Sequence, residues 1–108
     1  MFSNPIAGRE GEYNDWYDNQ HLGDVCAIPG VVGATRYDLV RLDPSSAAPH
    51  KYLAVYELDG DPAAVFAELG VRAGTEKMQM SEALDLSTIG MSIWKPRRQF
   101  SRSWLNMN

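Results

Sequence analysis

The amino-acid sequence predicts an α+β fold, a ferredoxin-like β-α-β-β-α-β protomer with a four-stranded antiparallel sheet and its helices on one face. Two observations predict it. Strand-like and helix-like patterns follow one another along the chain in that order, with two strands adjacent in the middle. The segment KYLAVYEL, residues 51–58, is apolar on both faces, which is typical of a strand that is covered on both sides.

Length and composition limit the chain to one small domain, residues 1–108. A net charge of −4 argues against a nucleic-acid partner, because phosphate binding needs a basic surface. The cations gather in one short cluster near the end of the chain, at Lys95, Arg97, Arg98 and Arg102. A single cysteine excludes an internal disulfide, and neither a signal peptide nor an apolar run of membrane-spanning length is present. We therefore expect a cytoplasmic protein with no membrane partner.

The first part of the chain predicts a strand and then a helix. Residues 1–3 resemble the end of a strand, and a loop follows over 6–10. A helix is predicted to start near Glu10 or Gly11, with Glu12 in its first turn, and to end before Pro29-Gly30. The predicted inner face of this helix holds Tyr13, Tyr17, Gln20, Asp24 and Ile28, with Trp16 and His21 on its margins.

This helix face is aromatic and able to exchange protons, where a helix that only packs on a sheet usually offers aliphatic side chains. Such a face suits the wall of a small-molecule pocket. The alternative is that the aromatic rings are core residues and His21 is a partly buried imidazole with its hydrogen bonds satisfied.

The remaining elements follow from period and turn chemistry. Strands are predicted over 31–42, 51–58 and 86–94, with a loop over 43–49. Asp61 is the predicted N-cap of a helix that starts with Pro62 and runs to Leu69, where Gly70 ends it. The alternative is an irregular extension of this helix over 71–74. A second short helix is expected over 75–83, and residues 100–108 form a tail.

The helices of this fold cover only one face of the sheet, so the second apolar face of residues 51–58 needs another partner. A second copy of the same sheet is the economical choice, which predicts a symmetric homodimer. The alternative is a monomer whose tail covers that face.

Several motifs in the first forty residues resemble the EthD-like branch of the dimeric α+β barrel superfamily. They are Asn4-Pro5, Gly8-Arg9-Glu10, Glu12-Tyr13, Trp16-Tyr17, His21-Leu22, Pro29-Gly30-Val31 and Arg36-Tyr37. The resemblance implies two ferredoxin-like sheets paired into a barrel, with a cleft between sheet and helices in each protomer. That superfamily includes cofactor-independent monooxygenases, lactone isomerases, polyketide cyclases, dehydratases and haem-binding enzymes, so the resemblance leaves the reaction open. Relatives have a longer apolar first strand than residues 1–3 provide. Either residues upstream of this sequence complete the strand, or the sheet has a short first strand, or the C-terminal tail compensates.

His21 is the leading catalytic candidate, because an imidazole titrates near neutrality and can take and return a proton. Asp24, three residues on, is expected to orient it, and Tyr17 and Tyr13 supply phenols for binding or oxyanion stabilisation. Arg36 lies in a half-apolar strand. We expect it to pair with an acidic residue, namely Glu57, Glu10 or Glu12, and the alternative is an anchor for an anionic substrate.

The predicted aromatic lining of the pocket is completed by Trp16, Tyr52, Tyr56 and Trp94. The spacing of His21 and His50 supports no metal site, and the glycines form no nucleotide fingerprint, so no metal or cofactor is expected.

The sequence thus favours a small cofactor-independent enzyme, an isomerase, cyclase, dehydratase or monooxygenase, that acts on an aromatic, lactone or polyketide-like molecule by proton transfer at His21. The alternative is a non-catalytic protein that binds a hydrophobic ligand or supports an oxygenase.

Overall fold

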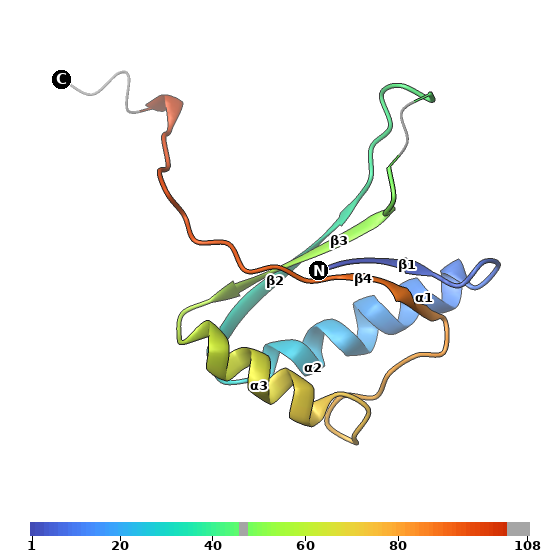
Figure 1. Ribbon diagram of the computed structural model, residues 1–108, viewed down its shortest axis with the longest axis horizontal. Coiled ribbons are helices and arrows are strands. Elements are labelled where there is room, and N and C mark those ends of the chain that lie inside the picture. The colour runs from blue at the N-terminus through green and yellow to red at the C-terminus, as the bar shows by residue number, and fades with distance from the viewer. Residues whose placement is uncertain (46–47, 104–108) are drawn as a thin grey trace.

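The computed structural model describes residues 1–45 and 48–103. Its strands and helices occur along the chain in the order β1 (Phe2–Pro5), α1 (Glu10–Trp16), η1 (Tyr17–His21), α2 (Leu22–Cys26), β2 (Val31–Asp38), β3 (Tyr52–Leu58), α3 (Pro62–Arg72) and β4 (Leu84–Gly90). The strands form one four-stranded sheet in the order β2-β3-β1-β4, and each neighbouring pair is antiparallel. Figure 1 shows the helices together on one side of this sheet. The fold is therefore α+β and is compatible with a ferredoxin-like arrangement.

The short first strand lies inside the sheet. Phe2 is paired with Leu53 of β3 on one side and with Gly90 of β4 on the other. The amide of Ala54 donates to the carbonyl of Met1 at 2.9 Å, and the amino group of Met1 donates to the carbonyl of Ala54 at 2.5 Å. Four residues of β1 therefore suffice to join β3 to β4.

The register of the sheet determines which side chains share a face. Partners in adjacent antiparallel strands lie on the same face, so Phe2, Leu53 and Tyr37 form one row. Side chains alternate along a strand, so Val55 lies on the same face as Leu53. Ala54 points to the opposite face, against the helices, and is 2% exposed. We call the face that carries Phe2, Tyr37, Leu53 and Val55 the free face.

The start of α3 is confirmed. The side chain of Asp61 accepts a hydrogen bond from the amide of Ala63 at 3.0 Å, and Pro62 occupies the first turn. The helix packs through Val65 against the turn at Gly30, where φ is +97° and an added Cβ would lie 3.1 Å from a Val65 methyl group. Gly30 thus allows α3 to approach the end of α2 closely.

The predicted ends of several elements are wrong. The third helix continues past Gly70 to Arg72, because one glycine lowers helix stability by only about 1 kcal/mol. No helix forms over 75–83. Gly74, at φ +82°, donates to the carbonyl of Met78 at 2.9 Å and closes a turn. This turn buries Met78. The apolar spacing suggested a helix because it indicates only which residues are buried, and a turn can bury them as well.

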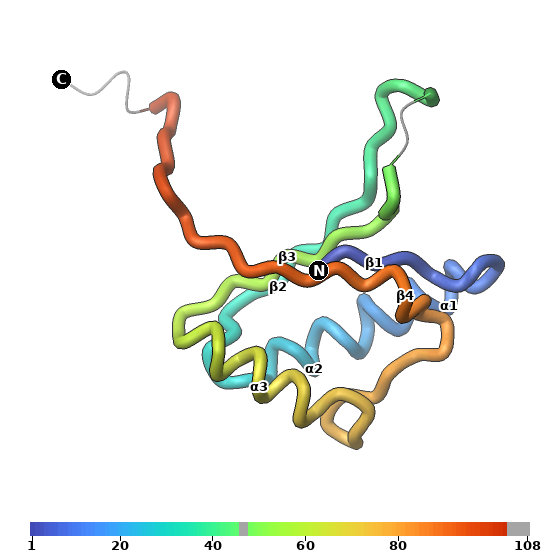
Figure 2. Tube along the Cα trace, viewed as in Figure 1, coloured from blue at the N-terminus to red at the C-terminus, as the bar shows by residue number. Residues whose placement is uncertain are grey.

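The second and fourth strands also differ from prediction. The second ends at Asp38 rather than at residue 42. The fourth spans Leu84–Gly90 rather than 86–94, and its last residue, Gly90, pairs with Phe2 of β1. Figure 2 shows that the chain after β4 and the connection between β2 and β3 both project away from the helices.

Two predictions fall partly outside the described residues. The predicted loop 43–49 includes residues 46–47, and the predicted tail 100–108 includes residues 104–108. In the part of the chain that the structure describes, no helix has both the length and the apolar character needed to cross a membrane.

Candidate active site

The helical stretch from Glu10 to Cys26 contains one π-helical segment, η1, between α1 and α2. A π turn holds more residues than an α turn, so it shifts every later side chain around the helix axis. The buried positions are therefore Tyr13, Tyr17, His21 and Val25, four residues apart. The sequence placed Gln20 and Asp24 on this face, and the π segment moves His21 and Val25 into their place. Isolated π turns in helices often occur at functional sites.

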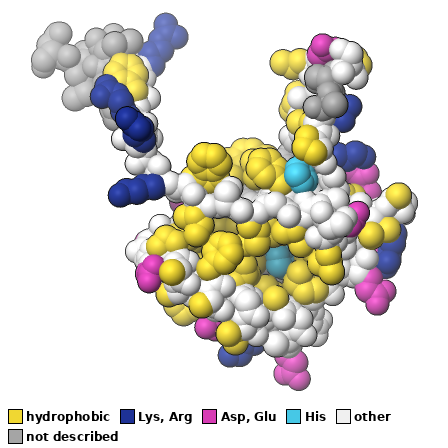
Figure 3. Space-filling view, viewed as in Figure 1, with side chains coloured by type: hydrophobic (Ala, Val, Ile, Leu, Met, Phe, Trp, Pro, Cys, Tyr) yellow, Lys and Arg dark blue, Asp and Glu magenta, His cyan; other side chains and the backbone are white. Residues whose placement is uncertain are grey.

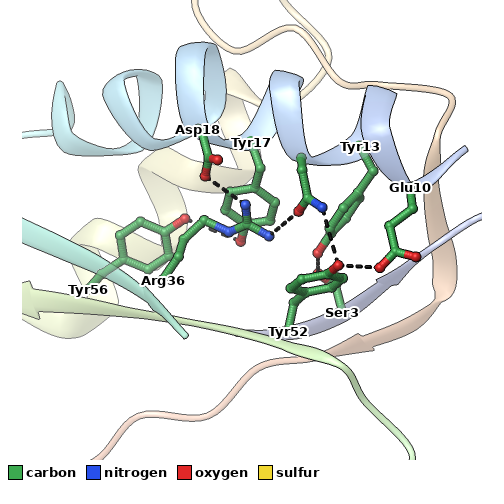
Figure 4. A network of polar contacts seen from close by, with 9 residues as sticks. Ser3, Glu10, Tyr13, Tyr17, Asp18, Arg36, Tyr52 and Tyr56 are labelled. Atoms are coloured by element: carbon green, nitrogen blue, oxygen red, sulfur yellow. Dashed lines mark hydrogen bonds and ion pairs between the residues drawn. The ribbon is translucent and has the colours of Figure 1, made fainter. Parts of the chain in front are cut away.

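Arg36 of β2 reaches from the sheet into this row of aromatic rings (Figure 4). Its guanidinium donates to Asp18 at 2.7 Å and to Asn14 at 2.9 Å. The guanidinium carbon lies 4.4 Å from the centroid of the Tyr17 ring, a cation–π distance. The predicted pairing with Glu57, Glu10 or Glu12 is wrong, because Arg36 is paired with Ala54 in the register and so faces the helices, whereas Glu57 lies on the other side of the sheet.

Further phenols extend the network toward the start of α1. Tyr52 donates to Glu10 through a short hydrogen bond and accepts one from Asn14 at 3.2 Å. Tyr13 and Ser3 share a hydrogen bond of 2.5 Å, and both are buried. Burial raises the pKa of Tyr13, which keeps this phenol neutral at pH 7. Near the start of α1, the phenols of Tyr13 and Tyr52 therefore both have hydrogen-bond partners.

Tyr17 and Tyr56 form a second phenol pair next to Arg36. The hydroxyl of Tyr56 donates to that of Tyr17 at 3.4 Å. Burial raises the pKa of Tyr56 to about 12 and raises the pKa of Tyr17 far above its usual range. Both phenols are therefore neutral at pH 7 and can donate hydrogen bonds, but neither is a base.

His21 is the buried titratable group on the other side of Tyr17, and it is 3% exposed. Its ring stacks on Trp16 with centroids 4.5 Å apart and meets the edge of Tyr17 at 4.9 Å. Burial lowers the pKa of His21 to about 4, so the imidazole is neutral at pH 7. Its Nδ1 is buried and has no hydrogen-bond partner among the described residues.

Two buried polar atoms without partners thus flank one ring, because Arg36 Nε is unpartnered in the same way. Tyr17 contacts both side chains, the guanidinium of Arg36 and the imidazole of His21. An unpartnered buried polar group costs about 1–3 kcal/mol, so proteins keep such groups mainly where water or a ligand completes them. These two atoms make the surroundings of Tyr17 the candidate position for a water molecule or a polar ligand.

The edge of this region is closed by Trp16, whose Nε1 donates to the carbonyl of Gln79 at 2.9 Å. Figure 3 shows hydrophobic side chains across the half of the molecule that contains the helices. His21, on η1, is buried in this helix layer.

The structure brings most of the predicted site residues together. Those in one connected cluster are Tyr13, Trp16, Tyr17, His21, Arg36, Tyr52 and Tyr56. Trp94 lies outside the cluster, beyond β4, and is 84% exposed. No hydrogen bond or ion pair joins Asp24 to His21 within the described residues.

Sequence reasoning missed Asn14 and Asp18, the two partners of Arg36. Their spacing of four residues places them one turn apart on the same side of a helix, and this spacing was the available signal. Asp18 is not among the residues of the predicted inner face, and its side chain is 56% exposed while its carboxylate holds the guanidinium.

Two surface hollows lie away from His21. One, of about 450 Å³, is lined by residues 4–8 with Glu10, Lys51, Asp85 and Thr88, and the other, of about 340 Å³, by residues near the end of α3. Within the described residues, no three His, Cys, Asp or Glu side chains are grouped so that they could hold a metal ion.

Comparisons of this chain with protein-family models, with curated proteins and with solved structures find no significant match.

Proposed function

We propose that the protein is a small homodimeric enzyme of the EthD-like kind, which moves a proton on an enolisable aromatic, lactone or polyketide-like molecule with His21 as the base. The observation that carries this proposal is the buried, neutral imidazole whose Nδ1 has no partner. A core histidine with a structural role normally has its ring nitrogens hydrogen-bonded. An unpartnered nitrogen on a buried imidazole, between the rings of Trp16 and Tyr17, supports a role toward a ligand.

The proposed step is a proton transfer that balances without a cofactor. The imidazole nitrogen takes a proton from carbon next to a substrate carbonyl, the C–H bond breaks, and its electron pair forms the enolate. His21 then returns the proton to another atom of the same molecule. Isomerisation, cyclisation or loss of water follows from where the proton returns.

The groups around Tyr17 suit the negative charge that this step creates. Tyr17 and Tyr56 are neutral phenols, and Arg36 adds a fixed positive charge 4.4 Å from the Tyr17 ring. Stabilisation of an oxyanion by such fixed donors is usually a large term in catalysis. In this proposal the stacked ring of Trp16, rather than Asp24, orients the imidazole.

The dimer in this proposal is supported by the free face of the sheet. Phe2, Tyr37 and Val55 are 40%, 51% and 43% exposed there, although they are apolar or aromatic and lie on adjacent strands. A contiguous apolar face of this kind is typical of an interface. Packing of two free faces would produce the dimeric barrel that the EthD-like resemblance implies.

A second candidate, a non-catalytic protein that binds a hydrophobic ligand, is favoured by the low pKa of His21. Each pKa unit corresponds to about 1.4 kcal/mol, so protonation of a group with a pKa of about 4 costs roughly 4 kcal/mol at pH 7. An enzyme must offset this cost by the attraction between the imidazolium and the enolate beside it. A binding protein needs only a hydrogen bond from the ligand to the neutral imidazole.

Hydrogen–deuterium exchange of 2-tetralone, an aromatic ketone with an easily enolised carbon, separates the two candidates. In D2O at pH 7, proton NMR should show exchange at C1 faster with the wild-type protein than in buffer. The His21→Ala variant should reduce this rate to that of buffer. The matched control, Gln20→Ala, changes the neighbouring half-buried residue and should retain the wild-type rate.

Circular dichroism of both variants checks that the fold is intact. Saturable shifts of the 2-tetralone signals without faster exchange would favour the binding protein. Faster exchange that survives in folded His21→Ala would refute His21 as the base.

A further inference from the structure

The segment that follows β4, residues 91–103, is here called the arm. Residues 91–100 are all exposed, and Ile93, Trp94 and Phe100 are 54%, 84% and 56% exposed. Large apolar side chains at this level of exposure are costly in water, at about 25 cal/mol for each Å². The arm therefore presents apolar surface that its own body leaves uncovered.

Three contacts are described within the arm. The indole of Trp94 donates to Ser92 at 2.8 Å, and the guanidinium of Arg98 lies 5.9 Å from the ring of Phe100. Ser101 and Ser103 share a hydrogen bond of 2.7 Å. Each of these contacts joins two residues of the arm that are two positions apart in the sequence.

The charge of the arm is opposite to that of the body. Residues 91–103 hold four of the ten cations of the chain, Lys95, Arg97, Arg98 and Arg102, and none of its fourteen anions. The remaining chain holds six cations against fourteen anions. A positive arm is attracted to a negative body at distances up to about a Debye length, roughly 8 Å at physiological salt.

The arm stands beside the free face. Figure 1 shows that the arm and the connection between β2 and β3 project from the same side of the sheet, opposite the helices, and stand at its two ends. Hydrophobic side chains gather between these two projections, and cationic side chains follow the arm (Figure 3). The free face thus lies between two projecting segments, and one of these, the arm, carries cationic and apolar side chains.

We propose that the arm clasps a second copy of this chain, with its apolar side chains on the partner and its cations against the partner's acidic body. The proposal rests on the dimer proposed above and adds the arm to its interface. A two-fold axis makes the exchange reciprocal, so each copy gives one arm and receives one. A second copy offers an apolar face for the apolar side chains of the arm and an acidic body for its cations. Nucleic acid and anionic lipid, in contrast, are repelled by the negative charge of the body.

A photo-crosslinker at the arm tests contact directly. Trp94 is replaced by benzoylphenylalanine, which bonds to C–H groups in contact when irradiated. Irradiation should produce a covalent dimer of twice the chain mass, seen by mass spectrometry. The same replacement at Val71, which is 69% exposed on α3, is the matched control and should produce little dimer. Crosslinks that form only within one chain would overturn the proposal.

Charge reversal tests the electrostatic part. Arg97→Glu combined with Arg98→Glu should raise the dimer dissociation constant about tenfold in sedimentation velocity at low salt, because attraction becomes repulsion. Arg9→Glu combined with Lys77→Glu makes the same change in net charge on the body and should leave the constant near that of wild type.

The two proposals fail in different ways. A wild-type protein that is monomeric at 100 μM, a concentration on the order of those at which weak dimers form, would refute the dimer and the clasp together. A wild-type dimer whose dissociation constant is unchanged by the arm variants, and which shows no crosslink between chains, would refute the clasp alone.

Discussion

The two faces of β3 differ in what covers them, although both are apolar. Ala54 is 2% exposed against the helices, and its neighbour Val55 is 43% exposed on the free face. Tyr52 and Tyr56 lie on the covered face, where each has a hydrogen bond to a group on the helices. One face of the strand is completed by its own chain, and the other lacks a cover from the described residues of its own chain.

The difference shows that the two faces of one apolar strand can have different roles. The covered face of β3 carries the phenols of Tyr52 and Tyr56, which need hydrogen-bond partners, and these partners come from the helices. The free face carries Phe2, Leu53 and Val55, which need only exclusion of water. Its polar groups include the phenol of Tyr37 and the carboxylate of Glu57. A surface of the second kind is suited to a copy of itself, whereas one of the first kind is suited to holding a specific polar group.

The largest effect should come from Tyr17, which is 1% exposed and contacts both Arg36 and His21. Tyr17→Ala should lower the free energy of unfolding by about 3–5 kcal/mol, because it leaves a cavity between two polar groups. Urea denaturation at fixed protein concentration measures the change. Val71→Ala, at an exposed position on α3, should lower it by less than about 0.5 kcal/mol. Equal losses in the two variants would contradict a specifically packed covered face.

The covered face should also show a pH effect through His21, whose pKa falls from 6.5 to about 4 on burial. Between these values the unfolded chain binds a proton that the folded chain does not, so unfolding is favoured as the pH falls. The stability present above pH 6.5 should decrease by about 3 kcal/mol by pH 4, at about 1.4 kcal/mol for each pH unit.

Urea denaturation across this pH range, at fixed protein concentration, compares the slopes of three proteins. His21→Leu should remove this part of the slope, whatever its own stability. His50→Asn changes the other histidine and should retain the slope. A slope that persists in His21→Leu would assign the pH dependence to other groups.

The coarse fold could be predicted from sequence because the signals for it are local. The Asp61-Pro62 helix start and the two-sided apolar pattern of 51–58 each depend on a few adjacent residues. The ends of β4 could not, because they depend on pairing with β1, which is about eighty residues away in the sequence. Sequence periodicity carries no record of how long the neighbouring strand is.

The site was predicted in composition but not in arrangement. The aromatic residues of the helix were correctly assigned to the inner face, yet a period of 3.6 placed His21 on a margin and Asp24 inside. The π segment places His21 inside and Asp24 outside the buried row. Its formation depends on packing against the sheet, so no local sequence pattern predicts it. The pairing of Arg36 with Asp18 depends in turn on how the side chains are rotated around the helix axis.

The free face allows the sharpest test of the comparison, because a change there should separate the copies without unfolding them. Val55→Lys places a charge in the middle of the proposed interface, where burial of an unpaired ammonium is costly, so the dissociation constant of the dimer should rise about 100-fold or more. Sedimentation velocity measures this change. Val71→Lys makes the same substitution on α3, outside the proposed interface, and should leave the constant near that of wild type. If the two variants weakened the dimer equally, the interface would lie elsewhere, whereas a Val55→Lys protein that unfolds would show that this face is needed within a single chain.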